Sequence, residues 1–303
     1  MTDPASIAAA LKTLQEADAR LLESYGYRLE PLTYYSPLNR LDFLEANEDL
    51  WSAPFVPLDI DWRVDHQLEV AREVSKYVGE LADIPEHAGC GSDFYWDNNF
   101  WNSADALVQY GLLRSRKPAK LIEVGCGFSS LLAARALRKN LEENIGDQTD
   151  VTLVEPYPRR ELLEKLPASW RRVETILQRC PLEWFETLGP GDVLFYDGSH
   201  CCHTASDVNW FFFRVLPRLR EGVLIHLHDI FFPRDYPREW LFERLQSWNE
   251  QFLLQAFLMN NSAYRVEIAN TFIANQREAE IRALYGEIQP FWGASFWMMK
   301  LAK

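Results

Sequence analysis

The sequence predicts an α/β fold, in which a doubly wound and mainly parallel sheet of seven strands follows an N-terminal helical cap. From residue 120 onwards, short apolar runs alternate with helical patterns. This alternation is typical of a parallel sheet that helices cover on both faces. The last two apolar runs, 264–269 and 295–301, have no compact helical crossover in the same rhythm. We therefore expect an antiparallel closing pair at one edge, with the last strand antiparallel.

The N-terminal third of the chain has helical rather than strand-like patterns. Asp3 is a suitable N-cap residue before Pro4, and the helix that begins there is expected to run to Ser24. Further helices are expected where apolar residues recur at helical spacing, at 67–81 and 103–115. We expect residues 1–95 to form the cap or lid and residues 96–303 to form the sheet domain.

Five strands are expected in the alternating part of the chain, each an apolar run of four to six residues. They are expected at 120–125, 150–155, 173–178, 192–197 and 222–227, with helices between them at 129–143, 159–166, 181–188 and 205–219. The segment 236–259 lies between the fifth and sixth strands and predicts a long helical insertion.

Composition excludes several classes of function. The formal net charge is −13, which argues against binding a phosphate backbone, and no nucleic-acid partner is expected. No apolar run reaches the about 18 residues of a membrane span, and the first residues do not resemble a signal peptide. The five cysteines are scattered and odd in number, which favours reduced thiols and a cytoplasmic protein.

The most informative motif is KLIEVGCGFSS at residues 120–130, where a strand runs through a glycine turn into a helix. Such a turn presents backbone N–H groups and a positive helix end to a ligand, and Gly125 and Gly127 allow close approach. Glu123 inside the strand would repel a pyrophosphate but suits a ligand with an ammonium group. The motif therefore favours S-adenosylmethionine over a nicotinamide dinucleotide.

Acidic residues also stand at the ends of the second and fourth strands. Glu155 follows the glycine turn at a distance that suits a carboxylate accepting both ribose hydroxyls. Asp197 stands at the carboxyl end of the fourth strand, where open α/β sheets bind ligands. In the loop before the helix expected at 103–115, Asp97, Asn98 and Asn99 either bind the amino-acid end of a cofactor or form a turn.

Histidines gather at the ends of the fourth and fifth strands, at positions 200, 203, 226 and 228. One interpretation is general base catalysis by His200 or His228. A second is ligation of a divalent cation by Asp197, His228 and Asp229, a mixed nitrogen and oxygen set. The third is packing or capping, which is the expectation for His226 and an open alternative for His203.

The runs IEVGCGFSS, VEP, FYDGSH and IHLHDIFFPRDYP together resemble the class I S-adenosylmethionine-dependent methyltransferases, which have a Rossmann-like fold. The resemblance is strongest to small-molecule and sugar O-methyltransferases of bacterial secondary metabolism, and it covers residues 95–300. It departs from the family pattern in having Phe128-Ser129 in place of a third glycine, and His228-Asp229 in place of an acidic or amide pair. The resemblance implies a cofactor site of Glu123, Gly125, Cys126, Gly127, Ser129, Ser130, Glu155, Pro156 and Asp197.

The resemblance also implies a reaction, which is methyl transfer from S-adenosylmethionine to a hydroxyl of a small-molecule acceptor. His200 or His228 would remove the hydroxyl proton, and Asp197 or Asp229 would orient that imidazole or a metal ion. N-methylation of a small amine and a non-catalytic scaffold are the alternatives. A nicotinamide-dependent oxidoreductase is disfavoured by Glu123 and by the lack of a GxGxxG motif. The aromatic-rich N-terminal region is a candidate surface for a homodimer.

Overall fold

The computed structural model describes residues 3–89, 93–143 and 148–302. The chain divides into two compact units, of which the smaller comprises Met1–Glu48 with Glu239–Ser247 and the larger comprises Asp49–Arg238 with Trp248–Lys303. Residues 49–95 therefore cluster with the sheet, although we expected them in the cap. The role of residues 1–95 as a cap or lid stays a prediction. Among the described residues, no helix has the length and apolar character needed to cross a membrane.

The smaller unit is helical. Asp3 caps α1 (Pro4–Glu16) as predicted, because its side chain accepts a hydrogen bond from the Ser6 backbone N–H. The expected single helix up to Ser24 is wrong beyond Glu16, because α2 (Ala19–Ser24) is a separate element. Asp18 explains the break, because its carboxylate accepts from the Arg20 N–H at 2.7 Å and so starts a new helix. The unit also contains α3 (Leu41–Ala46) and most of α10 (Arg238–Phe242).

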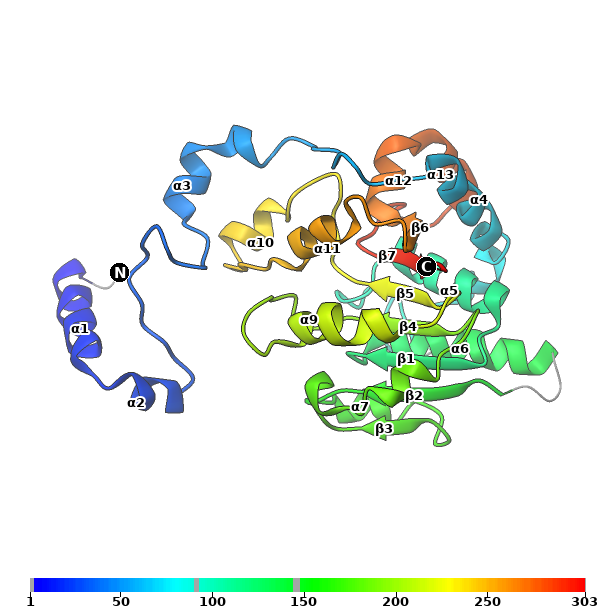
Figure 1. The fold of residues 1–303 in the computed structure, drawn as a ribbon, viewed down its shortest axis with the longest axis horizontal. Helices are drawn as coiled ribbons and strands as arrows, with labels where there is room; N and C mark the ends of the chain where they lie inside the picture. The colour runs from blue at the N-terminus through cyan, green and yellow to red at the C-terminus, as the bar shows by residue number, and fades with distance from the viewer. Residues whose placement is uncertain (1–2, 90–92, 144–147, 303) are drawn as a thin grey trace. The chain divides into compact units, whose positions relative to one another are not determined.

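The larger unit is built on a seven-stranded sheet in the order β3-β2-β1-β4-β5-β7-β6 (Figure 1). All pairs from β3 to β5 are parallel, and β7 is antiparallel to both β5 and β6. The predicted α/β fold and the antiparallel pair at one edge are therefore confirmed. The strands are β1 (Lys120–Val124), β2 (Asp150–Val154), β3 (Arg171–Val173), β4 (Val193–Tyr196), β5 (Leu224–Leu227), β6 (Tyr264–Ala269) and β7 (Phe296–Lys300).

Helices cover both faces of this sheet (Figure 1). Successive residues of a strand point to opposite faces, so one strand contributes side chains to two cores. Leu121 belongs to a core shared with α5 and α6, whereas Ile122 belongs to a second core that contains Val208 and Phe211. The helices of this unit are α4 (Val64–Ser75), α5 (Ser103–Arg116), α6 (Phe128–Glu143), α7 (Arg160–Leu163), α8 (Glu183–Glu186), α9 (Asp207–Trp210), α11 (Glu250–Leu258), α12 (Asn270–Gln276) and α13 (Glu278–Tyr285).

Two further element predictions are wrong. The third strand was expected at 173–178, but it ends at Val173. The apolar residue Ile176 instead caps a 3₁₀ turn that begins at Leu177, which is buried. The expected long helix at 236–259 is two helices, α10 and α11, because the backbone between them is bound to another loop. The N–H groups of Asn249 and Glu250 donate to the His200 carbonyl at 3.0 and 3.2 Å.

The order of the strands places three strand ends at one edge of the sheet. β1 pairs with both β2 and β4, and β4 pairs with β5, all in parallel register. The connections from β1 and from β4 leave in opposite directions along the sheet, so a crevice is expected between these strands. The residues that follow β1, β4 and β5 therefore face one crevice.

Candidate active site

A cavity of about 320 Å³ lies at this crevice. It is bounded by the glycine loop on one side and by the ends of β4 and β5 on the other. Its lining comprises Gly125–Ser129 after β1, Glu155 after β2, Asp197 and Gly198 after β4, His228 and Asp229 after β5, and Phe100, Trp101, Tyr157 and Arg159. Ser130 and Pro156, two predicted cofactor residues, are not part of this lining.

The two glycines of the loop have different roles. Gly125 has a φ of +85°, and a Cβ atom there would lie 1.8 Å from the Asp197 carbonyl oxygen. The loop is fixed at this point, since the Gly125 N–H donates to the Val154 carbonyl and the Asp197 N–H donates to the Val124 carbonyl. A Cβ on Gly127 would meet no described atom within 4 Å. Gly125 therefore accommodates the neighbouring strand, and Gly127 leaves open the space in front of the helix.

Glu123 lies behind the loop and not in the cavity lining. Its side chain is buried, Oε1 accepts from the Ser129 hydroxyl at 2.6 Å, and Oε2 has no hydrogen-bond partner in the described part of the chain. Burial raises the pKa of Glu123 to about 7; the hydrogen bond from Ser129 opposes this shift, and the charges of Asp197 and Glu155 add to it. Contact between Glu123 and a ligand ammonium group stays a prediction.

Glu123→Gln is expected to stabilise the protein at alkaline pH only. The folded state binds the Glu123 proton more tightly than the unfolded state, so the stability of the wild type falls as pH rises from the usual carboxyl pKa of 4.5 to about 7. Each pKa unit corresponds to about 1.4 kcal/mol, so the variant should gain about 3 kcal/mol at pH 8 and little at pH 4. Urea unfolding at both pH values measures this gain, and an equal gain at both would contradict the assignment.

Cys126 and Glu155 line the glycine-loop side of the cavity. Burial together with the charges of Glu123 and Glu155 raises the pKa of the Cys126 thiol to about 12. Glu155 Oε1 accepts from the Tyr157 N–H at 2.7 Å, which leaves its other oxygen available to a ligand. Four of the cysteines (126, 180, 201 and 202) are free thiols, as expected, and Cys90 lies outside the described residues.

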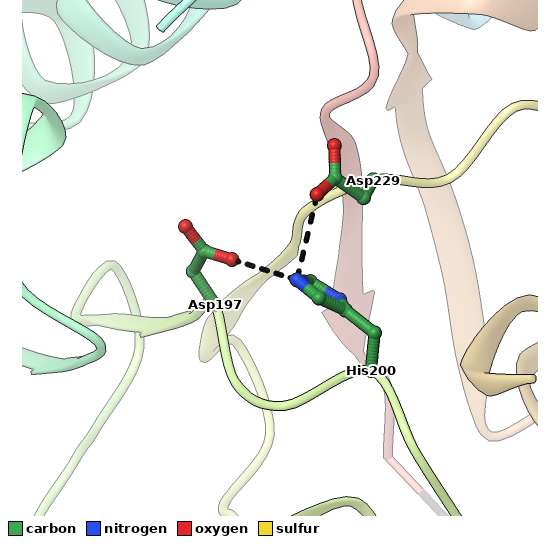
Figure 2. Close-up of side chains that lie close together, drawn as sticks. All are labelled: Asp197, His200 and Asp229. Atoms are coloured by element: carbon green, nitrogen blue, oxygen red, sulfur yellow. Dashed lines mark ion pairs between the residues drawn. The ribbon is translucent and has the colours of Figure 1, made fainter. Parts of the chain in front are cut away.

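On the other side of the cavity, Asp197 and Asp229 converge on His200 (Figure 2). His200 Nε2 lies 3.3 Å from Asp197 Oδ1 and 3.4 Å from Asp229 Oδ2. One ligand atom of each residue lies within 4.8 Å of the others, so this trio could hold a metal ion. The predicted ligand set was Asp197, His228 and Asp229. The structure brings His200 to this position, because a left-handed backbone at His200, with a φ of +58°, turns its ring toward the two carboxylates.

The second ring nitrogen of His200 contacts a residue that we did not expect. Nδ1 lies 2.8 Å from Oε2 of Glu250, which is buried at the start of α11. The Trp248 ring packs against the imidazole, with 4.2 Å between ring centroids. No pattern in the sequence marks Glu250 or Trp248, since both lie inside the insertion between β5 and β6.

These contacts set the charge of His200. Burial alone would lower the pKa of His200, but the contacts with Asp197 and Glu250 and the charge of Asp229 raise it well above its usual range. For Asp197, burial alone would raise the pKa, but the neighbouring His200 and His228 hold that pKa below its usual range. Burial raises the pKa of Asp229. Without a metal ion, His200 therefore keeps its proton and cannot accept another.

His228 is the histidine that faces the cavity. Its ring stacks on Trp101 at 4.3 Å, and its Nε2 lies 3.6 Å from Asp229 Oδ1. Asp229 has a φ of +57°, which is uncommon for a residue other than glycine and is held here by its surroundings. His228 therefore lines the cavity, and its role as a proton acceptor stays a prediction.

His226 and Asn98 have the contacts of structural residues, and His203 lies at the surface. His226 is buried, its Nε2 contacts the Ser295 hydroxyl at 3.1 Å, and burial lowers its pKa well below the usual range. His203 is exposed. Asn98 forms the turn that was one of two alternatives, because its Oδ1 accepts from the N–H groups of Phe100 and Trp101. This turn brings both rings to the cavity lining, which the sequence did not indicate.

The geometry agrees with comparisons to known proteins. A family model described as a methyltransferase domain matches residues 122–230, the segment that runs from β1 past the end of β5. Residues 122–230 therefore form a methyltransferase domain, in agreement with the resemblance to the class I S-adenosylmethionine-dependent methyltransferases. The matched segment contains the glycine loop, Glu155 and the strand-end residues Asp197, His200, His228 and Asp229. The methyltransferase is therefore an enzyme, and the methyl donor that this family implies is S-adenosylmethionine.

Two further proteins are similar to the methyltransferase. An uncharacterised protein of Archaeoglobus fulgidus is 30% identical over 171 residues, an alignment that covers 54% of this chain and 75% of that protein. A crystal structure of an S-adenosylmethionine-dependent methyltransferase from Anabaena variabilis is 12% identical, with 82% of this chain and 99% of that chain covered and a TM-score of 0.34.

Proposed function

We propose that the methyltransferase transfers a methyl group from S-adenosylmethionine to a hydroxyl group of a small-molecule acceptor, such as a sugar or another secondary metabolite. One observation carries the proposal: a single cavity joins the glycine loop, which belongs to the donor side, to His228 and Asp229. Its volume of about 320 Å³ falls within the usual range of small-molecule sites. The net charge of −13 is a further argument against a nucleic acid as acceptor.

The proposed mechanism is an in-line displacement at the sulfonium carbon, for which the protein mainly supplies positioning. Glu155 would accept hydrogen bonds from the ribose, and Glu123 would attract the ammonium group from behind the loop. His228 would accept the hydroxyl proton, and Asp229, 3.6 Å from its Nε2, would stabilise the imidazolium that forms. The Trp101 ring would keep this imidazole in place.

Asp197, His200 and Asp229 have the donor atoms that fit a divalent cation. Two carboxylate oxygens and one imidazole nitrogen form a mixed set that suits several divalent metals. The other ring nitrogen of His200 is bound to Glu250, and metal-ligating histidines usually have such a carboxylate partner. When bound, the ion would act as a Lewis acid toward the acceptor oxygen.

Calorimetric titration with S-adenosylmethionine tests the donor half of the proposal, and we expect saturable binding at one site. Absence of heat at millimolar donor would contradict it. For the acceptor half, transfer of a labelled methyl group should be measured against panels of phenols, sugars and amines, with and without added Mg²⁺ or Mn²⁺. Transfer to hydroxyl compounds is the expected result. Transfer to amines alone would instead establish N-methylation.

A further inference from the structure

The first turn of α11 contacts both loops that carry the site, although it lies outside the strands that form the site. On the β4 side, the backbone N–H groups of Asn249 and Glu250 donate to the His200 carbonyl. Asn249 Oδ1 also accepts from the Cys202 N–H at 2.6 Å. These bonds hold the loop on both sides of the imidazole, so the left-handed conformation of His200 depends on this turn.

The same turn holds the loop that follows β5. Gln251 Oε1 accepts from the Phe231 N–H at 2.5 Å, and its Nε2 donates to the Arg234 carbonyl at 2.9 Å. Gln251 is buried and does not contact His200 through any of these bonds. One helical turn therefore fixes the loop that carries Asp197 and His200 relative to the loop that carries Asp229.

Glu250 is expected to lower the stability of the fold in this position, which suggests that it has another role. Its side chain is almost completely buried, and Oε1 has no hydrogen-bond partner among the described residues. A buried carboxylate with unused acceptor capacity destabilises a fold. Within the described ranges, its one hydrogen bond from a side chain is the contact of Oε2 with His200 Nδ1 at 2.8 Å. A residue needed only for packing would be better served by an uncharged side chain of the same size.

We propose that Glu250 is a positioning residue of the methyltransferase. It accepts the Nδ1–H of His200 and thereby directs Nε2 at Asp197 and Asp229, the position from which His200 could ligate a metal ion. Its effect on turnover rests on the proposed function, but its effect on the His200 ring does not. Carboxylate partners of this kind, when removed, usually cost 10- to 100-fold in metal affinity or activity, on the order of what we expect here.

The test compares Glu250→Gln, Glu250→Asp and Gln251→Ala with the wild type. In metal-free protein, long-range ¹H–¹⁵N spectra of the histidine ring nitrogens report the protonation and hydrogen bonding of each His200 nitrogen. Glu250→Gln should change the His200 Nδ1 signal, lower Mn²⁺ affinity and kcat by about 10-fold or more, and leave KM for S-adenosylmethionine within about twofold. Glu250→Asp should restore part of each loss. Gln251→Ala, the matched control, should leave the His200 Nδ1 signal unchanged.

An unchanged His200 signal in a folded Glu250→Gln variant would overturn the proposal, whatever the activity. The same holds if Gln251→Ala changes that signal as much as Glu250→Gln does, because the role of Glu250 would then be structural only. If the wild type transfers no methyl group, the proposed function fails, while the ring nitrogen signals still decide whether Glu250 positions His200. Urea unfolding of each variant separates loss of fold from loss of position.

Discussion

Gly125→Ala is expected to destabilise the protein by about 2–5 kcal/mol. A left-handed residue with a side chain costs about 1–2 kcal/mol, and forcing atoms into a packed region costs about 1–3 kcal/mol more. Both effects apply, because φ is +85° and the new Cβ would lie 1.8 Å from the Asp197 carbonyl oxygen. That oxygen is backbone, so it cannot move unless β1 and β4 separate. Urea unfolding monitored by circular dichroism measures the loss.

Gly127→Ala is the matched control, two residues along the same loop. Its Cβ would meet no described atom within 4 Å, and its backbone is not left-handed. We expect this variant to fold with nearly wild-type stability but to bind S-adenosylmethionine more weakly in a calorimetric titration, because Gly127 lines the cavity. Wild-type stability of Gly125→Ala would show that the two strands can separate at little cost.

His228→Ala is expected to lower kcat for methyl transfer by about 100- to 10,000-fold, the usual contribution of a general base. Affinity for S-adenosylmethionine should change little, since His228 lies on the β5 side of the cavity, away from the glycine loop. Single-turnover transfer of a labelled methyl group measures the chemical step, and calorimetry measures donor affinity. His203→Ala is the control, because His203 is exposed and lies outside the cavity lining.

Full turnover in His228→Ala would remove the base from the mechanism. A loss that equals the loss of donor affinity would mean instead that His228 binds the donor. The predicted pattern, a large loss in kcat with donor binding retained, corresponds to an interaction made during the reaction and not in the ground state.

The sheet and the glycine-loop side of the cavity could be predicted from the sequence because both depend on local patterns. Apolar runs separated by helical patterns define parallel strands, and parallel strands bring their carboxyl ends to one edge. For this reason Gly125, Asp197 and His228 were expected at one crevice before any contact was known. β3 was placed wrongly because Ile176 and Leu177 have the apolar character of a strand, but Ile176 caps a 3₁₀ turn that begins at Leu177.

The acceptor side could be predicted only in part, because its geometry depends on contacts far apart in the sequence. His200 and Glu250 are 50 residues apart, and no spacing rule links them. The exchange of His200 for His228 beside the two aspartates depends on a left-handed backbone at His200, which the sequence around that residue does not indicate. The turn at Asn98 that carries Trp101 to the cavity is equally specific to the folded chain.

The left-handed backbones at His200 and Asp229 have a consequence for how this protein can change over evolutionary time. Each residue is kept in a conformation that costs about 1–3 kcal/mol, and at both positions glycine or asparagine would relieve that cost. Selection for a more stable chain would therefore favour substitutions at two positions to which the proposed function assigns a role. Under that proposal, stability and turnover are opposed at His200 and Asp229, and a relative that has lost its catalytic role should be free to relax both.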